Sequence, residues 1–163
     1  HKKGWDERWK EFGAWADKGQ QLKDQLLNLV DEDTKAFNKI MDAFGLPKST
    51  DAEKAARKQA IQEATRYAIE IPFKVMKLSL DSFEIIKAMA ADGNPNSVSD
   101  AGVGALCARA AVYGAYLNVK INAGSYDDKK YVEETLKAAK SMLDEAIKLE
   151  AEVLKIAEQK IEG

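Results

Sequence analysis

The sequence contains one cysteine and one histidine among its 163 residues. Cys107 has no second cysteine to pair with, which favours a reducing compartment. The histidine is His1, at the start of the chain, so Ser–His, Cys–His and histidine-ligated metal chemistry are nearly excluded inside it. Carboxylates, amides, lysine and tyrosine are the groups left for chemistry. We therefore predict a site without a metal ion or a bound cofactor.

The sequence also has no strong excess of one charge and no long apolar run. Its 45% hydrophobic and 32% charged residues are typical of a soluble globular protein, and its formal charge of -2 gives no general attraction to nucleic acid or to an anionic membrane. The longest nearly uncharged stretch, residues 98–119, contains Asp100 and Arg109 and is built from Ala and Gly. No secretory signal is visible. We predict a cytoplasmic protein that binds neither nucleic acid nor a membrane.

Apolar residues recur at three- and four-residue steps along the chain, and no window alternates like a strand. We expect a first helix from about Trp5 to Phe44, ended by a left-handed cap at Gly45 just before Pro47. Thr50 and Glu53 form the sequence pattern of a capping box, which opens a second helix.

Pro72 interrupts the second helical pattern, and we expect it to kink or split this helix because proline removes one backbone hydrogen bond. A third helix is expected from Ser97 or Ser99 to about Asn122, and a last one from about residue 125 to 161. The third helix is apolar almost all round and rich in Ala and Gly, which suits the middle of a bundle. The sequence therefore predicts an all-α bundle of four to five mostly long helices with a central helix rich in small residues.

Asp33 is the polar residue that fits its surroundings least. At about 100° per residue it shares one helical stripe with Leu26 and Phe37, and we expect this stripe to face the core. Asp31 and Glu32 point elsewhere, and we expect both to be solvated. A buried carboxylate has to be paired, protonated or next to a polar cavity, and burial raises its pKa towards the range useful for proton transfer. Asp33 is thus a candidate catalytic residue; a structural aspartate, or a stripe that bends away from the core, is the alternative.

Asn118 and Asn122 lie four residues apart, on one face at the end of the most apolar helix. Two amides there can bind the donor and acceptor edge of a flat heterocycle, although Asn also commonly caps the last turn of a helix. Asp100 stands near the start of the same helix, where a carboxylate accepts hydrogen bonds from free amides. We take these three residues as candidate binding residues.

Several short segments recur in the order found in one known family. They are Leu29–Phe37 followed by Gly45–Lys48, Ala60–Ala64 leading to Ile71-Pro72, Gly93-Asn94 with Ser99-Asp100, and Gly114–Val119 with Ile121-Asn122. In these segments the sequence resembles the formiminotetrahydrofolate cyclodeaminases. The second Asp of the family's Val-Asp-x-Asp motif, its catalytic residue, aligns with Asp33, which the helical stripe selects independently.

The resemblance implies an all-helical, usually dimeric enzyme. Members convert 5-formiminotetrahydrofolate to 5,10-methenyltetrahydrofolate and ammonia, or hydrolyse the methenyl compound to 10-formyltetrahydrofolate, and many are fused behind a glutamate formiminotransferase. It therefore implies a folate substrate, with or without a polyglutamate tail, bound by Asp100, Asn118 and Asn122, and a formiminotransferase domain or protein as a partner. A homodimer is also expected from the apolar stripe of Trp5, Trp9 and Phe12.

The chain departs from the family at its start, because members typically begin with a further helical segment that contains a Pro-Gly-Gly-Gly-Ser turn. We expect residues 1–163 to form a single cyclodeaminase-like domain that lacks this upstream segment. Cyclodeaminase activity is the first prediction. The alternatives are a methenyltetrahydrofolate cyclohydrolase on the same scaffold and a non-catalytic helical dimerisation domain.

Overall fold

The structure, a computed structural model, describes residues 6–162. This part of the chain folds into four long helices without strands, as predicted: α1 (Trp9–Gly45), α2 (Asp51–Asp92), α3 (Val98–Ala123) and α4 (Lys129–Glu162). Two short 3-10 turns, η1 (Asp6–Arg8) and η2 (Pro95–Ser97), precede α1 and α3. The predicted start of the first helix at Trp5 lies outside the described residues.

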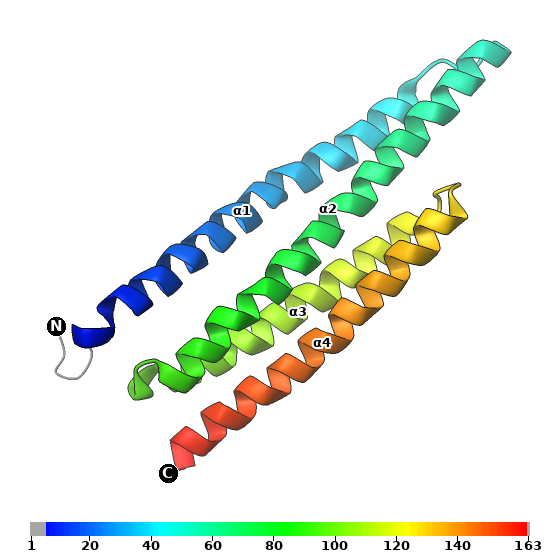
Figure 1. The fold of residues 1–163 in the computed structure, drawn as a ribbon. Coiled ribbons are helices and arrows are strands. Elements are labelled where there is room, and N and C mark those ends of the chain that lie inside the picture. Colours follow the sequence, from blue (N-terminus) through cyan, green and yellow to red (C-terminus); the bar gives the residue numbers. More distant parts are fainter. Residues whose placement is uncertain (1–5, 163) are drawn as a thin grey trace.

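The four helices lie roughly alongside one another, and α2 has the central place (Figure 1). Helix α2 contacts α1, α3 and α4, whereas α3 packs mainly between α2 and α4. Helix α1 packs mainly against α2. The α1–α2 end of the molecule extends past the turn between α3 and α4 (Figure 1). Among residues 6–162, no helix covers one face of α1 and one face of α3, where apolar side chains are exposed.

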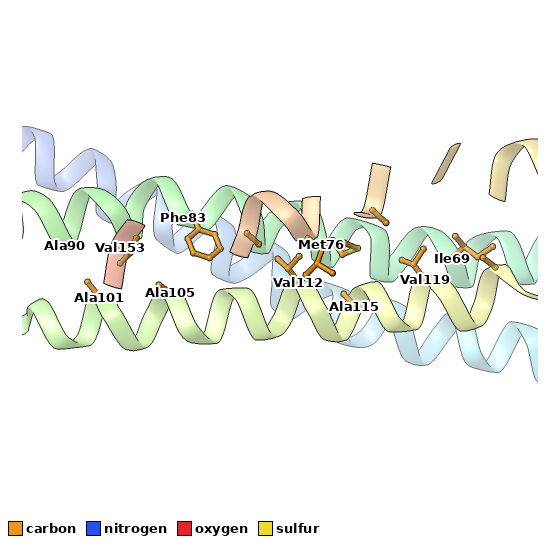
Figure 2. Packing of buried hydrophobic residues seen from close by; sticks show 14 residues of the cluster. Ile69, Met76, Phe83, Ala90, Ala101, Ala105, Val112, Ala115, Val119 and Val153 are labelled. Carbon is orange, nitrogen blue, oxygen red and sulfur yellow. The ribbon is translucent and has the colours of Figure 1, made fainter. Parts of the chain in front are cut away.

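The main core runs along the line where α2, α3 and α4 meet (Figure 2). Its largest fully buried members are Phe83, Met76 and Ile69 from α2, and burying each such side chain stabilises the fold by about 1.5–3 kcal/mol. Alanines of α3, such as Ala105 and Ala115, are also buried and permit close approach of the helices. Helix α1 docks on α2 through a smaller cluster, formed by Ala36, Ala68 and Ile71 with Leu29, Ile40 and Tyr67 around it.

Arg109, the only charge in the middle of α3, forms an ion pair with α4. Its Nε donates to Oε2 of Glu150 at 2.9 Å, and the Glu150 residue is only 9% exposed. The pKa of Arg109 is raised, first by this hydrogen bond and then by the charge of Glu150. The pair joins α3 to α4, and removing Arg109 would leave the nearly buried Glu150 carboxylate without this partner.

Two predicted helix boundaries, the start of α2 and the end of α1, have different outcomes in the structure. The capping box is confirmed: Thr50 Oγ1 accepts from the Glu53 amide at 3.2 Å, and Glu53 Oε2 accepts from the Thr50 amide at 2.8 Å. The predicted left-handed cap at Gly45 is wrong. Gly45 stays helical, and α1 ends because Leu46 becomes extended (φ -64°, ψ 149°), the conformation favoured before Pro47.

The sequence predicted that Pro72 kinks or splits the second helix. The split is wrong, because α2 is one helix from Asp51 to Asp92 with Pro72 inside it. Proline has no amide hydrogen, so it leaves the carbonyl four residues earlier, that of Ala68, without its helical donor. The side-chain amide of Asn122 on α3 donates to this oxygen at 2.7 Å. A contact between two helices thus replaces the bond that the proline removes.

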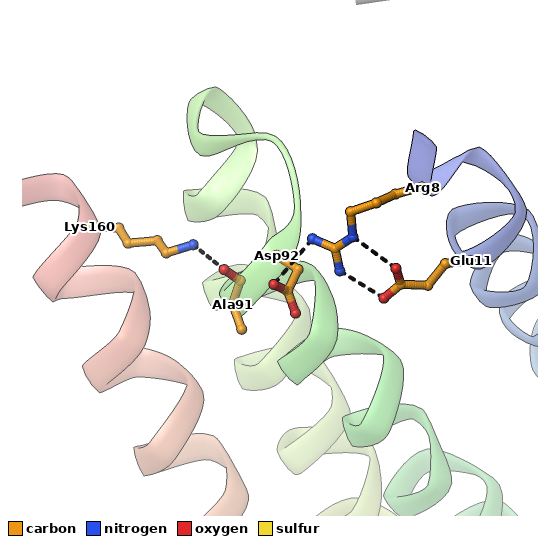
Figure 3. Close-up of polar contacts among 5 residues, drawn as sticks. All are labelled: Arg8, Glu11, Ala91, Asp92 and Lys160. Carbon is orange, nitrogen blue, oxygen red and sulfur yellow. Dashed lines mark hydrogen bonds and ion pairs between the residues drawn. The ribbon is translucent and has the colours of Figure 1, made fainter. Parts of the chain in front are cut away.

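Polar contacts join three helix ends at one end of the bundle (Figure 3). The Arg8 guanidinium pairs with Glu11 at 2.7 Å and reaches Asp92, the last residue of α2, at 3.4 Å. Lys160 of α4 donates to the Ala91 carbonyl, one of the last carbonyls of α2. These contacts hold the start of α1 and the end of α4 beside the end of α2.

Candidate functional site

Asp33 lies on the side of α1 that turns towards α3, and it is exposed. The prediction that its stripe faces the core is therefore wrong in part. Phe37 is 62% exposed and Phe44 is 51% exposed, while Leu26 is half-buried. Since α1 packs mainly on α2, that contact covers only part of its apolar stripe.

A cleft of about 400 Å³ opens between α1, α2 and α3, and Asp33 lines it. Its polar lining residues are Asp33 and Thr34 of α1 and Asn118 of α3. The remaining lining residues are apolar: Leu26, Leu29 and Val30 of α1, Pro72 and Val75 of α2, and Ala111 and Ala115 of α3. The structure thus brings two of the predicted site residues, Asp33 and Asn118, to the same cleft.

The surroundings of Asp33 differ from those of a structural ion pair. Within residues 6–162, its carboxylate has no hydrogen-bond or ion-pair partner, and no lysine or arginine lines the cleft. A solvent-connected carboxylate in a cleft with an amide and an apolar wall can bind a polar, flat ligand and accept a proton from it. The catalytic role of Asp33 stays a prediction.

Thr34 and Pro72 are cleft residues that the sequence did not identify as such. Thr34 follows Asp33 directly, and its hydroxyl donates to the Val30 carbonyl at 3.3 Å. Its position next to the selected aspartate was the available signal. For Pro72 the sequence offered no such signal, because the periodicity of one helix does not show which other helices pack against it.

The Glu32 side chain is 35% exposed, so it is solvated in part, and it also takes part in the contact between α1 and α2. Its carboxylate accepts from the Tyr67 hydroxyl and from Lys35 Nζ, the latter at 2.7 Å. These bonds lower the pKa of Glu32, that from Lys35 most. The pKa of Tyr67 is raised, first by its bond to Glu32 and then by burial. Lys39 lies 4.2 Å above the centre of the Tyr67 ring, which adds a cation–π contact to the cluster.

Asn118 and Asn122, which the sequence predicts as a pair of binding residues, have different partners in the structure. Asn118 lines the Asp33 cleft, whereas the Asn122 amide nitrogen is engaged with the Ala68 carbonyl, as described above. Asp100 is exposed in the first turn of α3 and lines another cavity, of about 410 Å³, with Asn94 and Gly104 among its neighbours. The structure does not bring Asp100 to the Asp33 cleft, and folate contacts by Asp100 and Asn122 stay predictions.

Sequence comparison identifies the family. The family described as Formiminotransferase-cyclodeaminase matches residues 1–141 of the chain. The chain belongs to this family. The match includes all of α1, α2 and α3, and therefore every residue that lines the Asp33 cleft.

Two relatives of this family show how far the similarity extends. The methenyltetrahydrofolate cyclohydrolase of Methylorubrum extorquens is 37% identical over 145 residues, which are 89% of this chain and 70% of the relative. The formimidoyltransferase-cyclodeaminase of Gallus gallus is 37% identical over 140 residues, 86% of this chain. That match spans only 26% of the chicken protein.

A solved structure has the same fold. The crystal structure of formiminotetrahydrofolate cyclodeaminase from Thermotoga maritima superposes with a TM-score of 0.84 at 23% identity. The match covers 98% of this chain and 76% of the Thermotoga chain. The helical arrangement described above is therefore the fold of that protein too.

Metal-ligating side chains are not grouped in the described part of the chain: no three of His, Cys, Asp and Glu lie close enough to hold one ion. Among the helices of residues 6–162, none combines the length and the apolar character needed to cross a bilayer. That the site works without a metal or a cofactor stays a prediction.

Proposed function

We propose that this protein converts 5-formiminotetrahydrofolate to 5,10-methenyltetrahydrofolate and ammonia in the cleft that Asp33 lines. The observation that carries the proposal is the common position of Asp33 and Asn118 on one open cleft with apolar walls. Membership of the formiminotransferase-cyclodeaminase family supports it, since a folate offers both an apolar ring face and a polar edge.

The reaction needs one group that accepts and returns a proton. N10 of the folate attacks the formimino carbon, a new N10–carbon bond forms, and N10 must lose its proton. The formimino group reacts as its cation, so the departing nitrogen already carries two hydrogens and needs one more. Once it has this third hydrogen, the bond from the carbon to the nitrogen breaks, and the nitrogen leaves as ammonia while the methenyl cation remains. Asp33 takes the proton from N10 and delivers it to the departing nitrogen.

The other cleft residues orient the substrate for this step. Asn118 offers an amide donor and acceptor for the polar edge of the folate, across the cleft from Asp33. The apolar residues from α1, α2 and α3 cover the ring face. Holding N10 against the formimino carbon removes much of the entropic barrier to ring closure.

A cyclohydrolase is the second candidate, and the similarity to the Methylorubrum methenyltetrahydrofolate cyclohydrolase favours it. In that reaction water attacks the methenyl carbon, and opening of the ring gives 10-formyltetrahydrofolate. Asp33 would then accept the proton of the attacking water. Both candidates use the same cleft.

The test is to give the full chain each folate separately. Formation of methenyltetrahydrofolate, followed by its absorbance, together with equimolar ammonia from 5-formiminotetrahydrofolate supports the first proposal. Hydrolysis of methenyltetrahydrofolate without reaction of the formimino compound replaces it by the second. No reaction with either folate overturns both and leaves the non-catalytic dimerisation domain.

We further propose that the protein acts as a homodimer and that a formiminotransferase domain or protein supplies its substrate. Exposed apolar side chains on α1 and α3 support the first statement, and the names of the vertebrate relatives support the second. A cytoplasmic location stays a prediction.

A further inference from the structure

The carbonyl of Ala68 occupies an unusual position in α2. Pro72, four residues later, has no amide hydrogen to donate to it. Ala68 is only 6% exposed, and Ile69 and Ile71 beside it are 0% and 1% exposed. A backbone oxygen in such surroundings requires a donor from elsewhere in the protein.

Asn122 supplies that donor from the last turn of α3. Its Nδ2 donates to the Ala68 oxygen at 2.7 Å, across 54 residues of sequence. The bond ties the proline site of α2 to α3, and we call it the Asn122–Ala68 strut. A capping role at the end of α3 does not account for it, because the side chain reaches another helix.

The strut lies beside the proposed folate cleft and connects two of its walls. Pro72, whose missing amide creates the need for the strut, lines the cleft from α2. Asn118, one helical turn before Asn122, lines it from α3. The distance between these two walls therefore depends on the bond that joins Asn122 to Ala68.

We propose that Asn122 is a positioning residue, which sets the separation of the Pro72 and Asn118 walls through the Asn122–Ala68 strut. This rests on the proposed function in so far as it concerns turnover. Asn122 acts on the substrate through Asn118 and Pro72. In this role Asn122 does not itself have to contact the folate. The strut itself is independent of the reaction.

A double-mutant cycle with Pro72 tests the strut. Asn122→Ala leaves the Ala68 carbonyl without a donor and should lower Tm by about 2–10 °C. In the Pro72→Ala background residue 72 regains an amide that can donate to Ala68, so the same change should lower Tm by less than half as much. Asn122→Ser replaces Asn122→Ala if the latter does not fold. Equal losses in both backgrounds would overturn the strut.

Turnover tests the positioning role, with whichever of the two folates the wild-type protein converts. Asn122→Ala should lower kcat/KM by about tenfold, because a small misplacement of the walls disturbs the reacting geometry. This loss should be smaller when Asn122→Ala is introduced into the Pro72→Ala background. A loss of the same size in both backgrounds, or no loss, overturns the positioning role.

Gln62 provides the matched control, since it joins α2 to the turn that follows α3 but does not line the cleft. Its Nε2 donates to the Ser125 carbonyl at 3.1 Å, and its Oε1 accepts from the Asp127 amide at 2.7 Å. Gln62→Ala should lower Tm while kcat/KM stays at the wild-type value. If it lowers kcat/KM as much as Asn122→Ala does, the effect of Asn122 is one of general stability, and the positioning role is wrong. If the wild-type protein converts neither folate, the proposed function and the positioning role both fail, while the Tm cycle still decides the strut.

Discussion

Asp31 and Asp33 are two residues apart on α1 and give a matched pair of substitutions. Asp33 lines the cleft, whereas Asp31 is exposed and does not line it. Asp33→Asn keeps the size of the side chain but removes its ability to carry the proton, so the turnover number for ring closure should fall by about 10²-fold or more. Circular dichroism should show an intact fold. Turnover by Asp33→Asn that remains close to that of Asp31→Asn would return Asp33 to a structural role.

Tyr67 and Glu32 give the contact between α1 and α2 a dependence on pH. Because the hydrogen bond to Glu32 raises the pKa of Tyr67 above the ordinary value of 10.0, the associated stability is fully present below pH 10.0 and is lost as the pH rises through the raised pKa. As the pH is raised through the alkaline range, the Tm of Tyr67→Phe should therefore fall by less than the Tm of the wild type. Tyr113→Phe, which leaves the Glu32 bond intact, is the control, and parallel alkaline profiles for all three proteins would contradict the prediction.

The sequence was sufficient to select Asp33 but not to describe its surroundings. Helical periodicity gives the direction of a side chain relative to its own helix, and this placed Asp33 and Leu26 on one stripe. How much of that stripe is buried depends on how many helices pack on α1, which a single helix does not encode. The contact of Glu32 with Tyr67 was missed for the same reason, since Tyr67 belongs to α2.

Helix boundaries were largely predictable, because they depend on local chemistry. The Thr50–Glu53 capping box marks the start of α2 in the sequence and in the structure. Whether α2 continues through Pro72 could not be decided from the sequence, since its continuity depends on a donor from α3 that is 54 residues from Ala68. Long-range hydrogen bonds of this kind have no local signature.

Gly93 and Gly102 should respond in opposite ways to replacement by alanine. A Cβ at Gly93, just after α2, would lie 2.3 Å from the Met89 carbonyl oxygen, so Gly93→Ala should lower Tm. A Cβ at Gly102, inside α3, would meet Leu154 and Ala157 of α4 at 3.6 and 3.7 Å, which are ordinary contact distances. Gly102→Ala should therefore stabilise the protein by about 0.5–1 kcal/mol, the difference in helix propensity. Thermal melts decide both, and a lower Tm for Gly102→Ala would show that α3 and α4 have no room for the methyl group.

The uncovered faces of α1 and α3 lead to a prediction about the assembled molecule. Exposed apolar side chains follow both helices: Leu27, Val30, Phe37, Met41 and Phe44 on α1, and Val103, Leu106, Tyr113, Leu117 and Ile121 on α3. Apolar surface of this extent is typical of an interface between chains. Light scattering at micromolar concentration should give twice the chain mass of 18.0 kDa.

Substitutions on one of these faces make the dimer prediction sharper. Val103→Glu combined with Ile121→Glu introduces two charges on the exposed face of α3, where these residues are 57% and 76% exposed, and should give a monomer. Lys137→Glu, at an exposed position of α4, is the control and should leave the mass unchanged. A monomer mass for the unchanged protein would contradict the prediction.

The packing of α1 mainly on α2 also has a kinetic consequence. A helix held mainly by one neighbour can detach while the rest of the protein stays folded, so its amide hydrogens should exchange with solvent faster than those of α2 and α3. A folate that lies between Asp33 on α1 and Asn118 on α3 would add a link between these helices. Deuterium uptake measured with and without folate should then slow most in α1. Bound substrate would thereby make α1 open together with α2 and α3, as part of one cooperative unit.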